Sequence, residues 1–236
     1  MSEVSLVLPA YNEAERLKDT VQQVAEALNK ITSSFEIIIA EDGSTDGTNK
    51  IAEELAKEHP YIKHRHSKDR LGRGKALNLA YKSSKGEILA YIDVDLATDL
   101  KHLEELINSI KDEEYDFSTG SRMLKESDVK RSFTRLIASK GFNFMTRLLL
   151  KSKIKDHQCG FKAFKREALF DILDEVKDKH WFWDTEILVR VQRKGYKIKE
   201  FPVRWRCGRN TKVDLKRDVI GMGTQIIRLW RELKSA

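Results

Sequence analysis

Predicted strands and helices alternate along the first half of this sequence, and that alternation constrains the fold more than any other feature. Short apolar runs rich in β-branched residues predict strands, and helical patterns separate them. The strands are predicted at 4–9, 35–40, 61–66 and 87–93, and the helices at 14–30, 47–58 and 73–84. Such alternation produces right-handed βαβ units. We therefore expect an α/β fold with a mostly parallel sheet flanked by helices.

The second half of the chain adds strands without any sign of a domain boundary. Two further strands are predicted at 116–121 and 195–203, and neither an internal repeat nor a low-complexity tract interrupts the sequence. With 236 residues, 40% of them hydrophobic, the chain can bury one sizeable core. We expect residues 1–236 to form a single domain that ends in an amphipathic helix.

Two carboxylates, in "YIDVDLATD", stand where the fourth predicted strand ends. Asp93 and Asp95 are separated by one residue, and alternate residues of a strand point to the same side. Like charges at that spacing cost free energy unless a cation or strong hydrogen-bond donors lie between them. The pattern predicts a bound cation, and a pair of solvated carboxylates without a metal is the alternative.

The ends of the first two strands carry further polar and aromatic residues. "PAYNE" follows the first strand with Pro9, Tyr11 and Glu13, and "EDGSTDGT" follows the second with Asp42. Ligands of parallel α/β sheets bind at the carboxyl ends of the strands. Each residue has an ordinary explanation by itself, since an Asp-Gly pair usually forms a turn. Their joint placement predicts a ligand site at this edge of the sheet.

Several segments together resemble a known enzyme family. "LVLPAYNE", "EDGSTDGT", "LGRGKALNLA" and "DVD" are similar, in order and spacing, to the inverting glycosyltransferases of family two, which have the Rossmann-like GT-A fold. "GSR" at 120–122, "DHQCGFKAF" at 156–164 and "WDTE" at 183–186 most resemble the dolichyl-phosphate mannose and glucose synthases. The "QCGFK" form favours the glucose branch. The resemblance covers most of the chain.

The resemblance implies a nucleotide-sugar donor whose base and ribose lie at the first two strand ends. The residues implied are the side chains of Pro9, Tyr11, Glu13 and Asp42, with the backbone around Ala40 and Val94 beside the nucleotide. Neither the base nor the sugar can be read from these residues, so UDP-glucose and GDP-mannose both stay open as donors.

By the same resemblance, Asp93 and Asp95 hold a divalent cation that bridges to the donor diphosphate. Such a cation neutralises the charge that builds up on the leaving group. Oxygen ligands with room for water suit Mg²⁺ or Mn²⁺. The sequence departs from the mannose synthases at Ala97, where these enzymes often carry Gln. The implied metal shell therefore has one protein ligand fewer.

Cationic residues that match the family pattern complete the implied diphosphate site. Arg122 ends the "FSTGSR" strand, and "RWRCGRNTK" offers Arg206 and Lys212 six residues apart, with Arg209 as an extra candidate. Arginine forks a phosphate with two hydrogen bonds, and lysine acts as a point charge. The catalytic set implied is Asp93, Asp95 and Arg122. A solvated basic loop is the alternative for the cations.

Two basic and apolar segments indicate the acceptor. Residues 122–155 hold ten Lys or Arg against Glu126 and Asp128, and the net charge of +7 favours an anionic partner. The segments 131–155 and 214–234 both carry apolar stripes, and a basic amphipathic helix can lie in a membrane interface. We expect a polyisoprenyl (dolichyl) phosphate acceptor and peripheral membrane contact. The alternative is that both stripes pack on the domain.

The expected location is the cytoplasm, at the cytoplasmic face of a membrane. No apolar run approaches the roughly 20 residues that span a bilayer, and "MSEVSLVLP" has no basic region typical of a signal peptide. Two cysteines, Cys159 and Cys207, favour free thiols in a reducing compartment. Relatives of this type often carry transmembrane helices, so a separate membrane-anchoring subunit stays open.

A hydroxyl acceptor is the alternative within the family. A sugar hydroxyl must lose a proton, and Asp184 or Glu186 in "WDTE" could serve as the general base. A lipid monophosphate is already anionic and needs only positioning. In the structural alternative, both carboxylates cap the helix that follows. The neighbouring aromatics at 181–183 are expected mainly in the core.

Two other classes of protein fit less well. A nucleotidyltransferase would carry a glycine-rich basic signature after its first strand, where this chain has "PAYNE". A nucleic-acid-binding protein would explain the charge, but no binding motif is present and the carboxylates would repel phosphates. We expect no nucleic-acid partner. His64, His66 and His157 are predicted to be structural, because the sequence shows no partners at metal spacing.

Overall fold

The structure is a computed structural model that describes residues 2–112, 114–206 and 215–235, without the side chains of 215–220. Three residues of the basic loop singled out in the sequence, Cys207, Arg209 and Lys212, lie outside the described residues.

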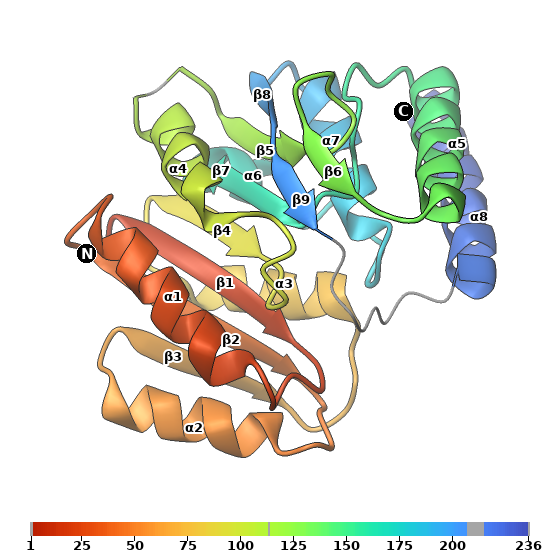
Figure 1. The fold of residues 1–236 in the computed structure, drawn as a ribbon. Helices are drawn as coiled ribbons and strands as arrows, with labels where there is room; N and C mark the ends of the chain where they lie inside the picture. Colours follow the sequence, from red (N-terminus) through yellow and green to blue (C-terminus); the bar gives the residue numbers. More distant parts are fainter. Residues whose placement is uncertain (1, 113, 207–214, 236) are drawn as a thin grey trace.

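Seven strands form the main sheet, in the order β3-β2-β1-β4-β7-β5-β8 (Figure 1). They are β1 (Val4–Ala10), β2 (Phe35–Asp42), β3 (Ile62–Ser67), β4 (Ile88–Ile92), β5 (Phe117–Ser121), β7 (Phe161–Lys165) and β8 (Ile198–Pro202). The first four strands pair in parallel, as do β5 and β8, while β7 runs antiparallel between β4 and β5. The predicted mostly parallel α/β sheet is confirmed. β7 was not among the predicted strands, because lysines interrupt the apolar pattern of this short strand.

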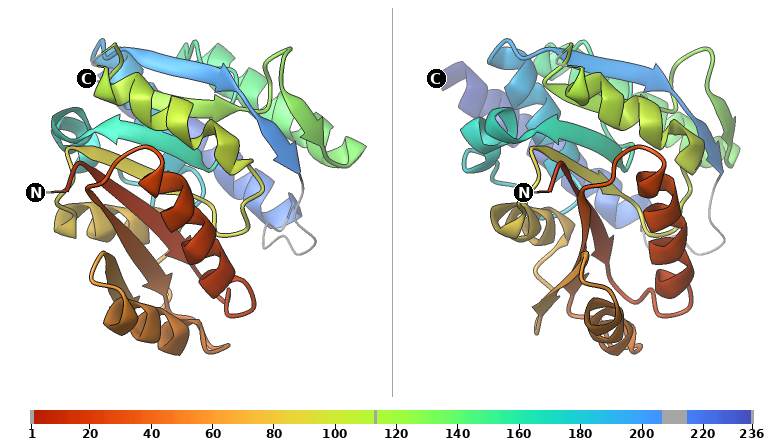
Figure 2. Two further views of the ribbon diagram at one scale, coloured as in Figure 1. Left: turned by 60° about the vertical axis from the view of Figure 1, so that its left-hand side comes forward. Right: turned by 90° about the vertical axis from the view of Figure 1, so that its left-hand side faces the viewer.

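Helices cover both faces of the sheet. One face carries α1 (Leu17–Asn29), α2 (Thr48–Glu58) and α4 (Leu103–Lys111), and the other carries α3 (Arg73–Ser83), α6 (Arg166–Leu173) and α7 (Trp183–Arg193). Figure 2 shows α1 and α2 on the side of the sheet opposite α3. These helices pack on the sheet because each buries an apolar stripe. In α1 the buried residues recur every three or four positions and form one stripe: Leu17, Val21, Val24 and Leu28.

Two longer helices lie side by side beyond the sheet (Figure 1). They are α5 (Phe133–Leu150) and α8 (Leu215–Ser235), the tail helix that the sequence predicts. Ile226 and Leu229 of α8 are buried in a small core with Leu150 of α5 and Val189 of α7. In the described part of α8, the apolar stripe therefore packs on the domain. Within the described ranges, no helix combines the length and apolarity that crossing a bilayer requires.

A two-stranded sheet closes over the end of β4. It pairs β6 (Asp128–Lys130) in parallel with β9 (Arg204–Arg206). Trp205 of β9 forms a bridge with Thr98, and the amide of Arg206 donates to the carbonyl of Ala97 at 2.8 Å. A short helical turn, η1 (Leu100–His102), follows. This packing places residues 204–206 beside the loop that carries Asp93 and Asp95.

Candidate active site

The loops after β1 and β2 are bonded to each other at the carboxyl edge of the sheet. Asn12 adopts a left-handed conformation with φ 53°, and its Oδ1 accepts from the Thr45 amide at 2.8 Å. The Glu13 amide donates to Oγ1 of Thr48 at 2.8 Å. Beside them, the guanidinium of Arg70 lies 3.9 Å from the ring centre of Tyr11. The structure therefore brings Tyr11 and Glu13 close to the loop after Asp42.

Asp42 holds the segment that leads into α3. Its carboxylate is buried and accepts from the amides of Leu71 at 2.7 Å and Gly72 at 2.9 Å. Ala40, two residues earlier, is buried opposite Pro9 in the parallel register of β1 and β2. Both Asp42 oxygens thus have backbone partners, and a ligand would meet an already fixed carboxylate.

Asp93 packs directly on a glycine. The Asp93 amide donates to the carbonyl of Gly160 at 3.0 Å. A Cβ atom on Gly160 would lie 1.9 Å from Oδ2 of Asp93, which no real contact allows. Glycine is therefore required at 160 for Asp93 to keep this position. No local pattern in the sequence marks this contact, since only the fold brings Gly160 to Asp93.

The second carboxylate, Asp95, faces solvent at the rim. Its Oδ1 accepts from the Ala97 amide at 3.0 Å, and no described residue forms an ion pair with it. The surrounding protein desolvates the group even though solvent reaches it, and this desolvation and the charge of Asp93 raise the pKa of Asp95. The neighbouring backbone of Val94 is fixed, because its carbonyl accepts from Thr20 Oγ1 at 2.8 Å. Two adjacent carboxylates, of which only Asp93 has an ion-pair partner among the described residues, fit a divalent cation.

Arg73 links the rim to the interior, and the sequence analysis did not single it out. Its Nη2 donates to Oδ1 of Asp93 at 2.6 Å, and its Nη1 donates to Oδ2 of Asp184 at 2.7 Å. The guanidinium also lies over the rings of Tyr91, at 5.0 Å, and Trp181, at 5.4 Å. The sequence signal was an arginine at a helix start inside "LGRGKALNLA", 111 residues before Asp184. Any cation at Asp93 would share this carboxylate with Arg73.

Asp184 is buried and has partners on several elements. Its Oδ1 lies 3.1 Å from Nζ of Lys162 and accepts from the Tyr91 hydroxyl. Burial raises the pKa of Asp184 to about 6, against the opposing charge of Arg73. Burial likewise lowers the pKa of Lys162 to about 7. Asp184 lies in the first turn of α7, and its carboxylate bonds the side chains of Arg73 and Tyr91 rather than the backbone amides of that turn.

Glu186, the other carboxylate considered as a base, is also buried and structural. It accepts from the amides of Lys177 and Asp178, and its carboxylate pairs with Arg190 at 2.8 Å. Trp183 and Phe182 lie in the core as expected, whereas Trp181 is half-buried.

Arg122 is held in a fork by a fully buried aspartate. Its Nε and Nη2 donate to the two oxygens of Asp156 at 2.7 and 2.9 Å. Burial raises the pKa of Asp156, but Arg122 outweighs burial and holds that pKa well below its usual value. Arg131 is a further cation that the sequence analysis missed. Burial and the charge of Arg122 lower the pKa of Arg131, and its Nε is buried without a described hydrogen-bond partner. The pair of arginines leaves an excess of positive charge here.

Arg206 stands near the same loop but has a partner of its own. Its Nη1 donates to the Asp128 carbonyl at 2.8 Å, and its Nη2 bonds the Asp128 carboxylate. That bond raises the pKa of Arg206. The structure therefore brings the backbone of Arg206 to the rim and turns its guanidinium to β6. Whether Lys212 joins it falls outside the described residues.

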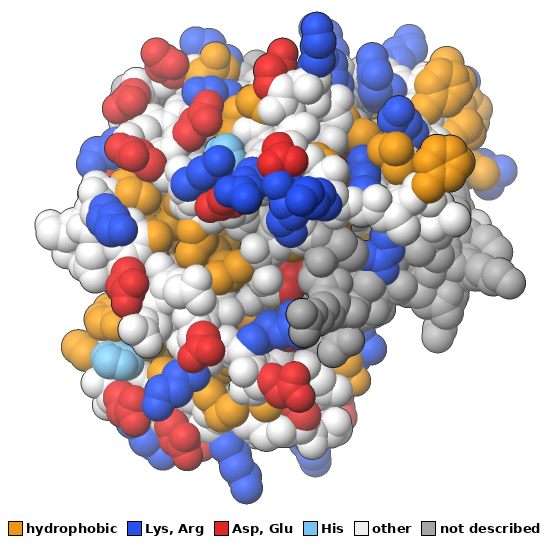
Figure 3. Space-filling view, viewed as in Figure 1, with side chains coloured by type: hydrophobic (Ala, Val, Ile, Leu, Met, Phe, Trp, Pro, Cys, Tyr) orange, Lys and Arg blue, Asp and Glu red, His pale blue; other side chains and the backbone are white. Residues whose placement is uncertain are grey.

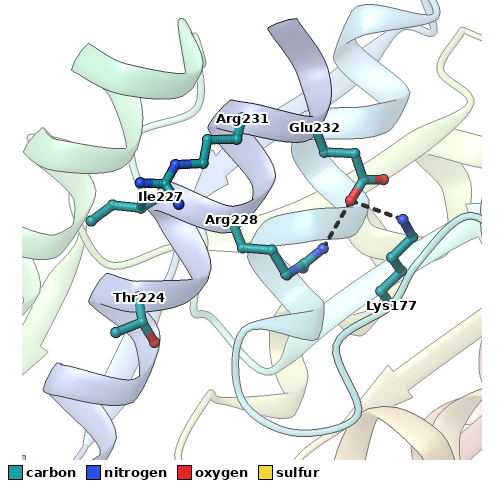
Figure 4. A pocket seen from close by; sticks show the side chains of 6 residues that line it. All are labelled: Lys177, Thr224, Ile227, Arg228, Arg231 and Glu232. Atoms are coloured by element: carbon teal, nitrogen blue, oxygen red, sulfur yellow. Dashed lines mark hydrogen bonds and ion pairs between the residues drawn. The ribbon is translucent and has the colours of Figure 1, made fainter. Parts of the chain in front are cut away.

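A hollow between α8 and the segment before α7 is separate from this site (Figure 4). It is lined by Lys177, Thr224, Ile227, Arg228, Arg231 and Glu232. Glu232 lies 3.1 Å from Lys177 and 3.2 Å from Arg228, so the charge of Glu232 is paired with cations of the same hollow. None of the predicted site residues that the structure describes lines this hollow.

Comparison with known sequences gives a consistent picture. A family model described as glycosyl transferase family 2 matches residues 5–173. The chain is 51% identical over 233 residues to glycosyltransferase AglD of Haloferax volcanii, covering 98% of this chain and 37% of that protein. It is 33% identical over 239 residues to a dolichyl-phosphate beta-glucosyltransferase of Dictyostelium discoideum, covering 96% and 73%. The chain thus spans only 37% of the length of AglD.

Solved structures share the fold. Glucosyl-3-phosphoglycerate synthase from Mycobacterium tuberculosis, in complex with UDP, has a TM-score of 0.70 at 20% identity, covering 97% of this chain and 79% of that one. Mannosyltransferase PcManGT from Pyrobaculum calidifontis, in complex with GDP-Man and Mn²⁺, has a TM-score of 0.60 at 22% identity, covering 89% and 58%. These likenesses confirm the predicted GT-A-like fold.

Proposed function

This chain belongs to glycosyl transferase family 2, and we propose that it transfers a hexose from a nucleotide-sugar to a polyprenyl phosphate, with inversion at the sugar carbon. Of the two donors left open by the sequence, UDP-glucose is favoured. The support is the similarity to dolichyl-phosphate beta-glucosyltransferases from several organisms, such as those of Dictyostelium discoideum and Saccharomyces cerevisiae.

The observation that carries the lipid acceptor is the exposed apolar face of α5. Its large hydrophobic residues, with their exposed fractions, are Phe133 73%, Ile137 55%, Phe144 62%, Met145 43% and Leu148 61%. Figure 3 shows hydrophobic side chains gathered over α5 with Lys and Arg beside them. An exposed apolar patch with basic neighbours is typical of a membrane contact. The helix begins two residues after Arg131, so this face adjoins the arginine pair.

In this proposal the rim holds the donor. Tyr11, Glu13 and Asp42, with the backbone of Ala40 and Val94 and the ring of Pro9, hold the nucleoside. Asp93 and Asp95 hold Mg²⁺ or Mn²⁺, which neutralises charge on the leaving diphosphate when bound. Support comes from the position of Asp95 beside Asp93, where desolvation and the charge of Asp93 raise the pKa of Asp95 and no described residue forms an ion pair with it.

We propose that arginine side chains bind the phosphates of the donor and the acceptor. Arg122 is already oriented by Asp156, so it reaches a phosphate without losing further freedom. Arg206 and Lys212 are proposed to add positive charge on the side of β9. Arg131, next to Arg122, is placed to meet the acceptor phosphate.

A lipid phosphate removes the need for a general base. The phosphate oxygen is already anionic and attacks directly. Asp184 then acts as a positioning residue, because its carboxylate binds Arg73, which in turn binds Asp93. A hydroxyl acceptor is the second candidate, favoured by the raised pKa of Asp184, which suits a general base.

The test is a transfer assay with radiolabelled UDP-glucose or GDP-mannose, dolichyl phosphate and Mn²⁺. A labelled product that enters organic solvent and is labile to mild acid supports the proposal. Asp184→Asn should keep much of the rate with a lipid phosphate, whereas loss of a general base costs roughly 10²–10⁴-fold. A large loss together with a water-soluble product would replace the lipid acceptor with a hydroxyl.

The membrane part of the proposal has its own test. The double variant Phe144→Ser, Leu148→Ser should bind vesicles containing anionic lipid more weakly than the wild type, while UDP-glucose binding in solution stays unchanged. Ile227→Ser is the matched control, because Ile227 is 47% exposed but lies on α8. Equal vesicle binding by all three proteins would remove α5 from the interface.

A further inference from the structure

Two histidines and a glutamate meet at the edge of the main sheet. His64 and His66 occupy alternate positions of β3 and therefore point to the same side. Glu41 of β2 lies opposite His66 in the parallel register. One potential ligand atom from each residue lies within 4.8 Å of the other two. The prediction that these histidines lack partners at metal spacing is wrong, because Glu41 is 25 residues before His66 and only sheet pairing unites them.

The carboxylate of this cluster is fixed from one side. Glu41 is 2% exposed, and its Oε1 accepts from the Ser44 amide at 2.5 Å. Its Oε2 lies 2.5 Å from Nδ1 of His66, whose side chain is 45% exposed. Ligands held on a rigid strand pair lose little freedom when an ion binds. Glu41 therefore forms the buried side of the cluster, and His66 forms the side that is open to solvent.

His64 has an unmet hydrogen-bonding group. Its Nε2 is buried and has no hydrogen-bond partner among the described residues. Leaving a buried polar atom unpaired costs free energy, so it calls for an explanation. A hydrogen bond between Glu41 and His66 accounts for those two residues but not for His64.

We propose that Glu41, His64 and His66 bind one divalent transition-metal ion of the Zn²⁺ class, in a site separate from Asp93 and Asp95. Two imidazole nitrogens and one carboxylate suit Zn²⁺ better than Mg²⁺ or Mn²⁺, which prefer oxygen ligands. Bonds of about 2.0–2.1 Å place tetrahedral ligand atoms roughly 3.4 Å apart. Glu41 and His66 need to separate by less than about 1 Å, which the exposed His66 ring allows. Solvent supplies the fourth position.

The ion would tie three parts of the chain together. It would fasten the edge strand β3 to β2, and through Glu41 to the loop that begins at Ser44. Asp42 follows Glu41 directly and holds the segment before α3. The site would therefore have a structural role beside the loops that follow β1 and β2. It goes beyond the proposed function, and its test does not depend on sugar transfer.

The experiment is a calorimetric titration of metal-free protein with Zn²⁺ in excess Mg²⁺, repeated with Co²⁺ to record its absorption spectrum. The background is the double variant Asp93→Asn, Asp95→Asn, which removes the other carboxylate pair. One equivalent of Zn²⁺ should still bind to it, and Co²⁺ should give the intense visible bands of a four-coordinate ion. If the double variant binds no Zn²⁺, the proposal is overturned.

Substitutions in the cluster locate the ion. In that background, His66→Ala and Glu41→Gln should each weaken Zn²⁺ binding by more than about tenfold. Removing a residue that only hydrogen-bonds to a metal ligand costs about tenfold or more, and loss of a ligand itself should cost at least as much. Neither change endangers the fold, since His66 is exposed and Gln keeps an acceptor for the Ser44 amide. His59→Ala is the control, because His59 lies outside the cluster. Zn²⁺ binding that is unchanged in both cluster variants would overturn the assignment.

Discussion

Two pairs of aspartates lie at one site, but they differ in how far neighbouring cations compensate their charges. Asp156 and Asp184 are buried and bonded to cations: Asp156 to Arg122, and Asp184 to Arg73 and Lys162. Asp93 and Asp95 stand at the rim, where Arg73 reaches Asp93 but no described residue pairs with Asp95.

The comparison separates burial from charge compensation. Asp156 is fully buried and yet has a depressed pKa, because a forked arginine outweighs desolvation. Asp95 reaches solvent and yet has a raised pKa, because desolvation and the charge of Asp93 outweigh the opposing Ala97 amide and Arg16. The charge of Asp156 is therefore compensated by the protein itself, whereas the cations beside Asp184 do not fully offset its burial, and its pKa stays raised. The rim aspartates are left for a ligand to complete, and the following variants test this difference.

The largest expected effect is on Asp156. Asp156→Asn leaves Arg122 buried without its counter-charge, which should lower the free energy of unfolding by about 3–5 kcal/mol. Urea unfolding followed by circular dichroism measures this. Asp174→Asn is the matched control, because Asp174 is 83% exposed and pairs with Lys82 at the surface, so its loss should cost under about 1 kcal/mol. Equal losses in the two variants would show that the Asp156 pair is not special.

The next effect is a pH dependence through Asp184. Its pKa is raised from 3.8 to about 6 in the folded protein, so the folded state binds this proton more tightly than the unfolded chain. The stabilisation is full below about pH 3.8 and is lost as pH rises through about 6. The difference corresponds to roughly 3 kcal/mol.

The measurement compares the wild type with Asp184→Asn, which cannot titrate at 184. The unfolding free energy of the wild type minus that of the variant should fall as pH rises from 4 to about 7. Other carboxylates titrate in both proteins and cancel. A difference that is flat or that rises would mean that Arg73 and Lys162 compensate Asp184 as fully as Arg122 compensates Asp156.

A smaller effect concerns the contact under Asp93. Gly160→Ala forces its Cβ against the Asp93 carboxylate, and overpacking of this kind costs about 1–3 kcal/mol. It should also displace Asp93 and weaken Mn²⁺ binding, measured by calorimetry. Gly141→Ala is the control, because a Cβ there meets nothing within 4 Å and the residue lies in α5. Unchanged Mn²⁺ affinity in Gly160→Ala would argue that Asp93 is not a ligand of the cation.

The smallest effect is a gain. Asp95→Asn removes a rim charge that no described cation pairs with, so the metal-free protein should become more stable by less than about 1 kcal/mol. Asp93→Asn should show no such gain, because it also loses the bond to Arg73 at 2.6 Å. Thermal unfolding with a chelator measures both, and both variants should lose sugar transfer. A destabilised Asp95→Asn would show that its charge is already compensated.

Local patterns in the sequence determined the architecture and the position of the rim. β-Branched runs and amphipathic spacing predicted six of the strands and the three helices between the first four of them, because side-chain periodicity follows from the backbone geometry of each element. The βαβ connection then fixes which strand ends share an edge. For this reason the sequence by itself places "PAYNE", Asp42 and the pair Asp93 and Asp95 at one edge of the sheet.

Tertiary structure alone decided which charges meet. Arg73 and Asp184 are 111 residues apart, Arg122 and Asp156 are 34 apart, and Glu41 and His66 are 25 apart. No local periodicity encodes such pairs, because each depends on how strands and helices pack across the sheet. The insertion of β7 between β4 and β5 brings Lys162 and Gly160 to the site in the same way. The sequence supplies the charged groups, and packing determines which of them are neutralised and which stay open to a ligand.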